Sequence, residues 1–143
     1  MVAQLTNIRM PEKQGKLEQS YREGGWTARQ IIHHLPDSHL NMYIRLKWTL
    51  TEVHPTIKPY NQDMWADLDE AKHGDIEVSL TLLEALHERV NRTLRKLNVI
   101  DFERTYFHPE LQRNLTLDEM VQMYAWHGNH HVGQLKVIAA MLD

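Results

Sequence analysis

The chain has 143 residues, a formal net charge of −3, ten histidines and no cysteine. This length is typical of one domain with its own hydrophobic core, so residues 1–143 are expected to form a single domain. The lack of cysteine excludes disulfide frameworks, cysteine-ligated zinc sites and a cysteine nucleophile, and the negative net charge disfavours a nucleic-acid partner.

The beginning of the chain carries no targeting or membrane signal. Residues 1–11 lack the apolar core of a signal peptide, and no stretch of the chain approaches the ~18 consecutive apolar residues that span a membrane. We therefore expect a cytoplasmic protein without a membrane partner. Pro11 and Gly15 interrupt this region, so it predicts at most a short first helix.

The first strong helix signal begins at Thr27. Thr27 and Gln30 have the spacing of a capping box, and the helix is expected to end near Pro55, because proline disfavours helical angles in the residue before it. The main apolar stripe consists of Ile31, Leu35, Met42, Leu46, Leu50 and Val53, and a second apolar side consists of Leu40, Ile44 and Trp48. A helix that is apolar on two sides is buried twice or packs against a partner subunit.

A second long helix is expected between two long connections. Residues 54–74 and 98–115 contain helix breakers and aromatic side chains. Between these connections, apolar residues recur at helical spacing over residues 76–97, and Asp75 stands where a helix cap is expected.

The last helix opens at a second capping box, formed by Thr116 and Glu119. Apolar residues then recur at helical spacing almost to the end of the chain. No segment alternates convincingly with period two. We therefore predict an all-α fold, a helix bundle with up-and-down helices and long crossover connections.

Histidines on two of these helices are candidate metal ligands. His127 and His131 are four residues apart, so they lie one turn apart on the apolar face of the last helix. Two such imidazoles can chelate a divalent metal, although two hydrogen-bonded core histidines would show the same spacing. A third ligand would come from the first long helix, where His34 and His39 are both candidates. Helical spacing does not choose between them, because Pro36 lies between them and disturbs the ideal helical angles.

The other histidines have weaker claims to a site. His87 reaches the apolar side of its helix and is expected to be a packed, hydrogen-bonded residue. The remaining five are predicted to lie at the surface or in loops: His33, His54, His73, His108 and His130.

A longer series of motifs follows in order along the chain. The motifs are YREGGWT at 21–27, QIIHHL at 30–35, DSH at 37–39, LTE at 50–52, PTIKPY at 55–60, WA at 65–66, DFERT at 101–105, HP at 108–109, TLDE at 116–119 and YAWHGNHH at 124–131. In this combination and order they closely resemble the YfiT-like branch of the DinB superfamily. The match covers about residues 21–138 and is far more specific than one pair of histidines.

The resemblance implies a four-helix bundle, usually dimeric, with a metal site of three histidines. Their positions in the motifs correspond to His34, His127 and His131, which favours His34 over His39. The metal is zinc or nickel in different members, so one Zn²⁺ per subunit is the first choice and Ni²⁺ the alternative. Members are named as metal-dependent hydrolases. Some are thiol S-transferases that use bacillithiol, and more distant relatives use mycothiol or glutathione.

Two features depart from the family pattern. Pro36 replaces the small residue usual after the leucine that follows the first ligand, and it predicts a bend near His34. The chain is also short by most of a first helix. A shortened first helix would expose core surface that the second subunit of a homodimer could cover.

Two classes of function follow, of which the first is a metal-dependent enzyme acting on a small molecule. Gly128 occupies the position of the glutamate base of HExxH peptidases, so a hydrolase would need another base, such as Asp37 or Glu119. A thiol transferase needs no such base, and without cysteine its thiol must come from outside; we therefore favour transfer. The second class is a non-catalytic dimeric helical module with a structural or vestigial metal, where His39 or His87 completes a closed site.

Overall fold

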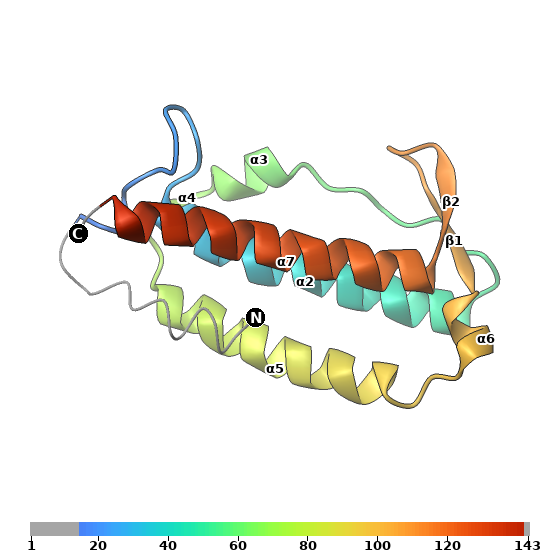
Figure 1. The fold of residues 1–143 in the computed structure, drawn as a ribbon. Helices are drawn as coiled ribbons and strands as arrows, with labels where there is room; N and C mark the ends of the chain where they lie inside the picture. Colours follow the sequence, from blue (N-terminus) through green and yellow to red (C-terminus); the bar gives the residue numbers. More distant parts are fainter. Residues whose placement is uncertain (1–14, 142–143) are drawn as a thin grey trace.

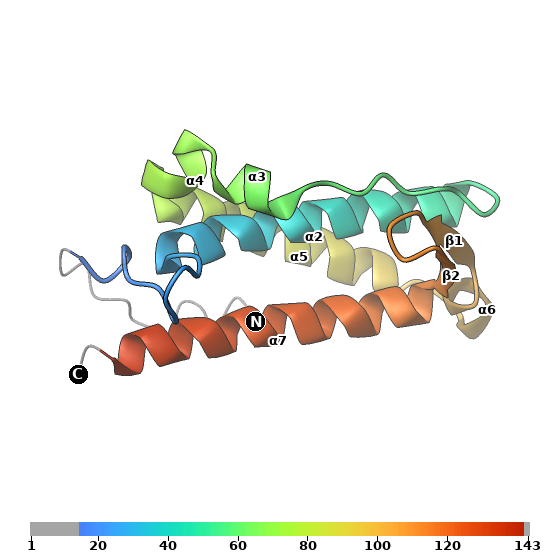
Figure 2. The same cartoon turned by 90° about the horizontal axis from the view of Figure 1, so that it is seen from above.

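Three long helices form the body of the molecule. The computed structural model describes residues 15–141, in which α2 spans Ala28–Thr51, α5 spans Ile76–Leu94 and α7 spans Leu117–Ala140. Helix α2 packs against both α5 and α7; it runs in the same direction as α5 and opposite to α7 (Figure 1 and Figure 2). The predicted short first helix falls on residues 1–14, outside the described residues.

The helix starts follow the predicted capping residues. The Thr27 side chain accepts a hydrogen bond from the backbone of Gln30, and the Gln30 side chain accepts one from the backbone of Thr27. Thr116 and Glu119 form the same reciprocal pair at the start of α7, and the Asp75 side chain caps α5. Each pair satisfies backbone N–H groups that lack a partner inside the helix, which fixes where the helix begins.

The connection after α2 returns along the bundle, because α2 and α5 run in the same direction. It contains two short helices, α3 (Gln62–Ala66) and α4 (Asp69–His73), which both pack on α2 (Figure 2). The predicted crossover connection is therefore present, with helical turns that its sequence did not indicate.

The connection between α5 and α7 contains a short hairpin. Helix α6 (Val99–Phe102) is followed by the antiparallel strands β1 (Thr105–His108) and β2 (Arg113–Thr116). The predicted all-α class holds for the fold as a whole, but these strands were not predicted. Each strand is four residues long, which is too short for a pattern of period two to stand out from a loop.

The apolar core has two parts with a polar layer between them. One cluster joins the first half of α2 to the end of α7 and consists of Ala28, Ile31, Ile32, Leu35, Leu83, Val132, Leu135 and Ile138. The other joins the second half of α2 to the start of α7 and the hairpin and consists of Met42, Leu46, Ile57, Val90, Tyr106, Leu115, Leu117, Met120 and Tyr124. Between them along α2 and α7 lie the buried polar side chains of His34, Ser38, His39 and His131.

The second apolar side of α2 is half-exposed. The exposed fractions of Leu40, Ile44 and Trp48 are 37%, 38% and 36%. Residues 15–141 therefore cover this side only in part, so the alternative of packing against a partner subunit stays open. No helix among residues 15–141 combines the length and the apolar composition needed to cross a membrane.

The capping box of α7 gives a test of this account of the helix starts. Replacing Thr116 by Ala removes the side-chain acceptor for the Glu119 backbone N–H, so we expect a loss of about 1 kcal/mol in the free energy of unfolding. Chemical denaturation measures this loss. The control is Thr51→Ala, because the exposed Thr51 hydroxyl donates to a carbonyl oxygen within the last turn of α2. Its loss should change the free energy of unfolding by less than about 0.5 kcal/mol. Equal effects of the two substitutions would contradict the capping role.

Candidate metal centre

Three imidazole rings converge in the polar layer between the two core clusters. Nε2 of His127 lies 3.1 Å from Nε2 of His34 and 3.2 Å from Nε2 of His131. One nitrogen from each ring falls in a group whose members all lie within 4.8 Å of one another. Helix α2 supplies His34, and successive turns of α7 supply His127 and His131. Of His34 and His39, between which helical spacing did not choose, it is His34 that lies with the two α7 histidines in this group.

The ring of His131 is oriented by its neighbours. Its Nδ1 lies 2.8 Å from Oε1 of Gln134, whose amide nitrogen lies 3.0 Å from Nε2 of His130. With the amide oxygen accepting, Nδ1 of His131 carries the proton and its Nε2 keeps a free lone pair toward the cluster. The ring of Trp26 is stacked on His131, with 13° between the two planes, and its centroid lies 4.7 Å from that of His34.

Burial keeps the three imidazoles neutral. Removal from water, and next the neighbouring imidazoles, lower the pKa of His34 to about 2 and that of His127 to about 4. Burial also lowers the pKa of His131, against the opposing effect of its bond to Gln134. At neutral pH all three rings are therefore in the form that binds metals.

The donor set fits a divalent cation such as Zn²⁺. Two nitrogens on a tetrahedral zinc, with Zn–N bonds of about 2.0–2.1 Å, lie about 3.3 Å apart. The two Nε2 separations of 3.1 and 3.2 Å are close to this value. Convergent lone pairs of neutral rings repel one another unless a proton or a cation lies between them. A cation would therefore stabilise this arrangement of the three rings.

The remaining histidines do not join this cluster. Nε2 of His87 lies 2.9 Å from Nδ1 of His39, which confirms His87 as a packed, hydrogen-bonded residue. The His39 ring lies 5.8 Å from that of His127, measured between centroids. His39 and His87 thus form a second pair beside the three-histidine group.

Two histidines predicted at the surface are buried, so that prediction is wrong for His33 and His108. The turn between α4 and α5 covers His33, whose Nδ1 lies 2.7 Å from the Ser79 hydroxyl and whose Nε2 lies 3.2 Å from the Gly74 carbonyl oxygen. His108 ends strand β1 and is buried because the unpredicted hairpin folds back on α2 and α7. Exposed positions are confirmed for His54, His73 and His130.

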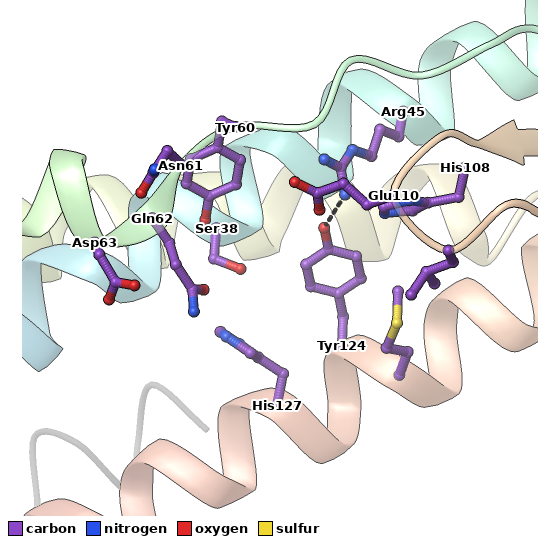
Figure 3. A pocket seen from close by; sticks show the side chains of 12 residues that line it. Ser38, Arg45, Tyr60, Asn61, Gln62, Asp63, His108, Glu110, Tyr124 and His127 are labelled. Carbon is purple, nitrogen blue, oxygen red and sulfur yellow. Dashed lines mark hydrogen bonds between the residues drawn. The ribbon is translucent and has the colours of Figure 1, made fainter.

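Two cavities flank the three-histidine group. The first, of about 490 Å³, is shown in Figure 3, and its lining includes Ser38, Arg45, Tyr60, His108, Glu110 and Tyr124. The second, of about 370 Å³, lies toward the start of α2, and its lining includes Tyr21, Trp26, Trp126, His130, His131 and Gln134. Gln62, Asp63 and His127 line both cavities, so the two meet beside the cluster.

The carboxylates of these cavities differ from those suggested by the sequence. Asp37 and Glu119 line neither cavity. Glu119 is engaged by the cap of α7 and by Arg113, whose Nη2 lies 2.6 Å from its carboxylate. The carboxylate that lines both cavities is instead that of Asp63, in the first turn of α3. It was missed because no helix was predicted in that connection.

Arg45 was also missed, although the sequence carried a signal for it. It stands directly before Leu46 in the apolar stripe of α2, where a charged side chain is unexpected unless it has a partner. In the structure it is buried against Tyr124, whose hydroxyl oxygen accepts a hydrogen bond of 2.9 Å from Nη1 of Arg45 (Figure 3).

The environment of Asp37 gives a test by pH. Burial, and next the charge of Glu70, raise its pKa from 3.8 to about 6. Above pH 6 the Asp37 carboxylate is ionised in the folded and in the unfolded protein. Its charge is unfavourable in the folded protein, where it is partly buried near Glu70, so Asp37→Asn should raise the free energy of unfolding at pH 7–8. The site is only half-buried, and solvent screening reduces the expected gain to about 1 kcal/mol.

This gain should shrink as the pH falls through 6, because the folded wild type then takes up a proton. It should vanish below about pH 4, where both states are protonated. Urea denaturation between pH 4 and pH 8 measures it, with the exposed Glu84→Gln as the control on α5. A gain that does not depend on pH would contradict the raised pKa.

Comparison with known proteins gives the same fold and family. A family model described as the DinB superfamily matches residues 9–135. A protein of Oceanobacillus iheyensis named "Putative metal-dependent hydrolase" is 48% identical over 128 residues, which are 90% of this chain and 73% of that protein. The Bacillus subtilis protein "Putative metal-dependent hydrolase YfiT" is 43% identical over 120 residues, which are 84% of this chain and 67% of that protein.

A solved structure of YfiT from Bacillus subtilis superimposes with a TM-score of 0.95 and 38% sequence identity, over 99% of this chain and 81% of that one. That protein is described as "a probable metal-dependent hydrolase with an unusual four-helix bundle topology". The predicted four-helix bundle of the YfiT type is thereby confirmed. By the family model and by its close relatives, the chain belongs to the DinB superfamily.

Proposed function

We propose that the chain is a metal-dependent enzyme that binds one divalent cation through His34, His127 and His131, with Zn²⁺ as the first choice and Ni²⁺ as the alternative. The observation that carries this proposal is the convergence of three neutral imidazoles, of which His127 lines both cavities. Three protein ligands leave a position for water or substrate, which is typical of catalytic and not of structural zinc sites. Both cavities have the size of small-molecule sites.

The favoured reaction is transfer of an external thiol, of the bacillithiol type, to a small electrophile. A divalent cation at this site lowers the pKa of a water or thiol in its open position. In the transfer, the sulfur forms a bond to the electrophilic carbon, the leaving group departs with its electron pair, and the thiol proton passes to solvent. Two cavities on either side of His127 offer separate places for thiol and electrophile.

Hydrolysis is the second candidate, and the position of Asp63 favours it. This carboxylate lines both cavities together with His127, so it is placed to accept a proton from an attacking water. The names of the relatives in Oceanobacillus iheyensis and Bacillus subtilis point to the same reaction class.

A structural or vestigial metal site remains the non-catalytic alternative. A closed structural site needs a fourth protein ligand, and His39 and His87 are the nearest further histidines. In the structure these two rings bond to each other, and the group of convergent donors within residues 15–141 contains only the three histidines. This arrangement favours an open site.

Metal stoichiometry tests the ligand set. The wild type should bind one divalent cation per chain, and His34→Ala should weaken binding more than about 100-fold, because loss of a group that merely orients a ligand already costs about 10–100-fold. Isothermal titration with Zn²⁺ and elemental analysis measure this effect. The matched control is His73→Ala, an exposed histidine of α4 that bonds to Asp69.

The same variants separate the open site from the structural one. Metal-free wild type and His34→Ala should both keep the helical circular dichroism of the wild type, since the two apolar clusters do not depend on a metal. Unfolding on metal removal would support the structural reading. Full occupancy in His34→Ala would contradict the ligand set.

The reaction class is tested with zinc-loaded and metal-free protein. Bacillithiol, glutathione and mycothiol are each offered with monobromobimane, and ester hydrolysis is followed with p-nitrophenyl acetate without thiol. Conjugation that requires both metal and one of the thiols supports transfer. Thiol-independent hydrolysis that falls at least about tenfold in Asp63→Asn supports the second candidate. Neither activity in metal-loaded protein would contradict both.

We also propose that the chain forms a homodimer through the outer side of α2. The half-exposed Leu40, Ile44 and Trp48 lie on that side, and Ile44, Trp48 and Trp65 line one shallow hollow. Sedimentation equilibrium should give twice the mass of one chain, and Ile44→Glu should lower it to that of the monomer. Val78→Glu, at an exposed position of α5, is the control. A wild-type monomer would contradict the proposal.

A further inference from the structure

Arg45 is a buried cation that forms no salt bridge with the described residues. Its side chain is 6% exposed, and none of the carboxylate oxygens of residues 15–141 lies within 4.0 Å of it. Its Nη1 donates to the Tyr124 hydroxyl at 2.9 Å, its Nη2 donates to the Lys58 carbonyl oxygen at 3.1 Å, and its Nε has no partner in the described part of the chain. A guanidinium stays charged and offers five N–H donors, so part of its hydrogen-bonding capacity is unused.

Folding alone gives no reason for this arrangement. Burying an unpaired charge is costly, and an apolar side chain of similar volume would avoid that cost. The side chain lines the larger cavity beside the three-histidine group. A buried cation that faces a cavity is the arrangement expected for a ligand anion.

His108 adds a second unpartnered polar group at the same end of the cavity. It is 7% exposed, and its Nδ1 is buried without a partner among the described residues. Burial, and next the charge of Arg45, lower its pKa, so it faces the cavity as a neutral imidazole. The Tyr124 hydroxyl accepts from Arg45 and therefore keeps its own proton for donation to a ligand.

We propose that Arg45, His108 and Tyr124 bind the carboxylate group of a small-molecule ligand whose remaining part extends toward His127. Figure 3 shows Arg45, His108, Glu110 and Tyr124 at one end of the cavity, and Asn61, Gln62 and Asp63 at the other. The centroids of the Tyr124 and His127 rings are 6.1 Å apart. The Tyr124 hydroxyl is bonded to Arg45, so a ligand anchored at Arg45 extends past the Tyr124 ring toward His127. That this ligand is the substrate rests on the proposed function.

The charges of the cavity favour a carboxylate over a phosphate. Arg45 is the only charged cation among the lining residues, because His108 is neutral, whereas Glu110 and Asp63 are both acidic. The single guanidinium compensates the charge of a carboxylate, whereas a phosphate dianion would keep one uncompensated charge beside these acidic groups. Glu110 is exposed on the loop between β1 and β2, where its carboxylate competes with a ligand anion for Arg45.

The test titrates carboxylates into metal-free full-length protein and follows the side-chain Nε–H of Arg45 by proton–nitrogen NMR. Benzoate and the smaller acetate are compared with benzamide and acetamide, their uncharged matches, and with inorganic phosphate at constant ionic strength. We expect a saturable shift of this resonance with at least one carboxylate, at least tenfold tighter than with its amide or with phosphate. Tighter binding of phosphate, or no shift with either carboxylate, would overturn the proposal.

Variants show whether the charge of Arg45 is responsible. Arg45→Met should weaken carboxylate binding at least tenfold, read from backbone amides of the β1–β2 loop. Arg92→Met is the matched control, an exposed arginine of α5 paired with Glu88. Equal binding in Arg45→Met and the control would overturn the proposal.

Glu110→Gln keeps the test independent of whether a variant at the buried Arg45 folds. Glu110 is exposed, and removing its competing charge should tighten carboxylate binding about threefold. Unchanged or weaker carboxylate binding in Glu110→Gln would overturn the proposed carboxylate site. These titrations use metal-free protein, so their outcome does not depend on metal binding. A negative result for carboxylate binding would not change the measured metal stoichiometry, and absence of metal binding would not change the shifts of the Arg45 resonance.

Discussion

The structure depends on a layer of buried imidazoles placed between two apolar clusters. Burial of polar rings is unfavourable unless each ring finds a partner, and the clusters on either side supply the hydrophobic stabilisation that offsets this cost. His34 and His131 lie in this layer, with half-buried His127 between them. The same burial that makes the layer costly keeps its rings neutral, which is the state that a divalent cation requires.

The direction of the helices brings this layer together. Because α7 runs opposite to α2, the histidines in the first half of α2 lie beside those near the middle of α7. The crossover connection and the hairpin then cover the layer without filling it, and they supply Asp63 and His108 to the cavity walls. The helices thus fix the three convergent histidines, while the connections line the cavities beside them.

The sequence predicted the parts of the site that depend on regular helices. The capping boxes at Thr27 and Thr116 placed the helix starts, and the four-residue spacing placed His127 and His131 on one face. The choice of His34 over His39 depended on the resemblance, because both rings are 3% exposed and helical spacing gives each a buried position.

The parts that were missed belong to irregular segments. Strands of four residues carry too little periodicity to be recognised, so the buried position of His108 and the place of Glu110 beside Arg45 had no basis in the pattern. His33 was misplaced for a similar reason, since the turn at Gly74 that covers it is a long-range contact. Arg45 differs from these, because a charge inside an apolar stripe is visible in the sequence and indicates a buried partner or ligand.

His39 and His87 pair with each other beside the three-histidine group. This pairing explains why only three of these five imidazoles form a group of convergent donors. Nδ1 of His39 is directed to Nε2 of His87, and the His39 ring lies 5.8 Å from that of His127. A fourth imidazole turned toward the cluster would close a tetrahedral site. His127 of the cluster lines both cavities together with Asp63, and Arg45 lines the larger one. The bond between His39 and His87 therefore occupies one nitrogen of each ring and leaves the group of convergent donors among the described residues at three.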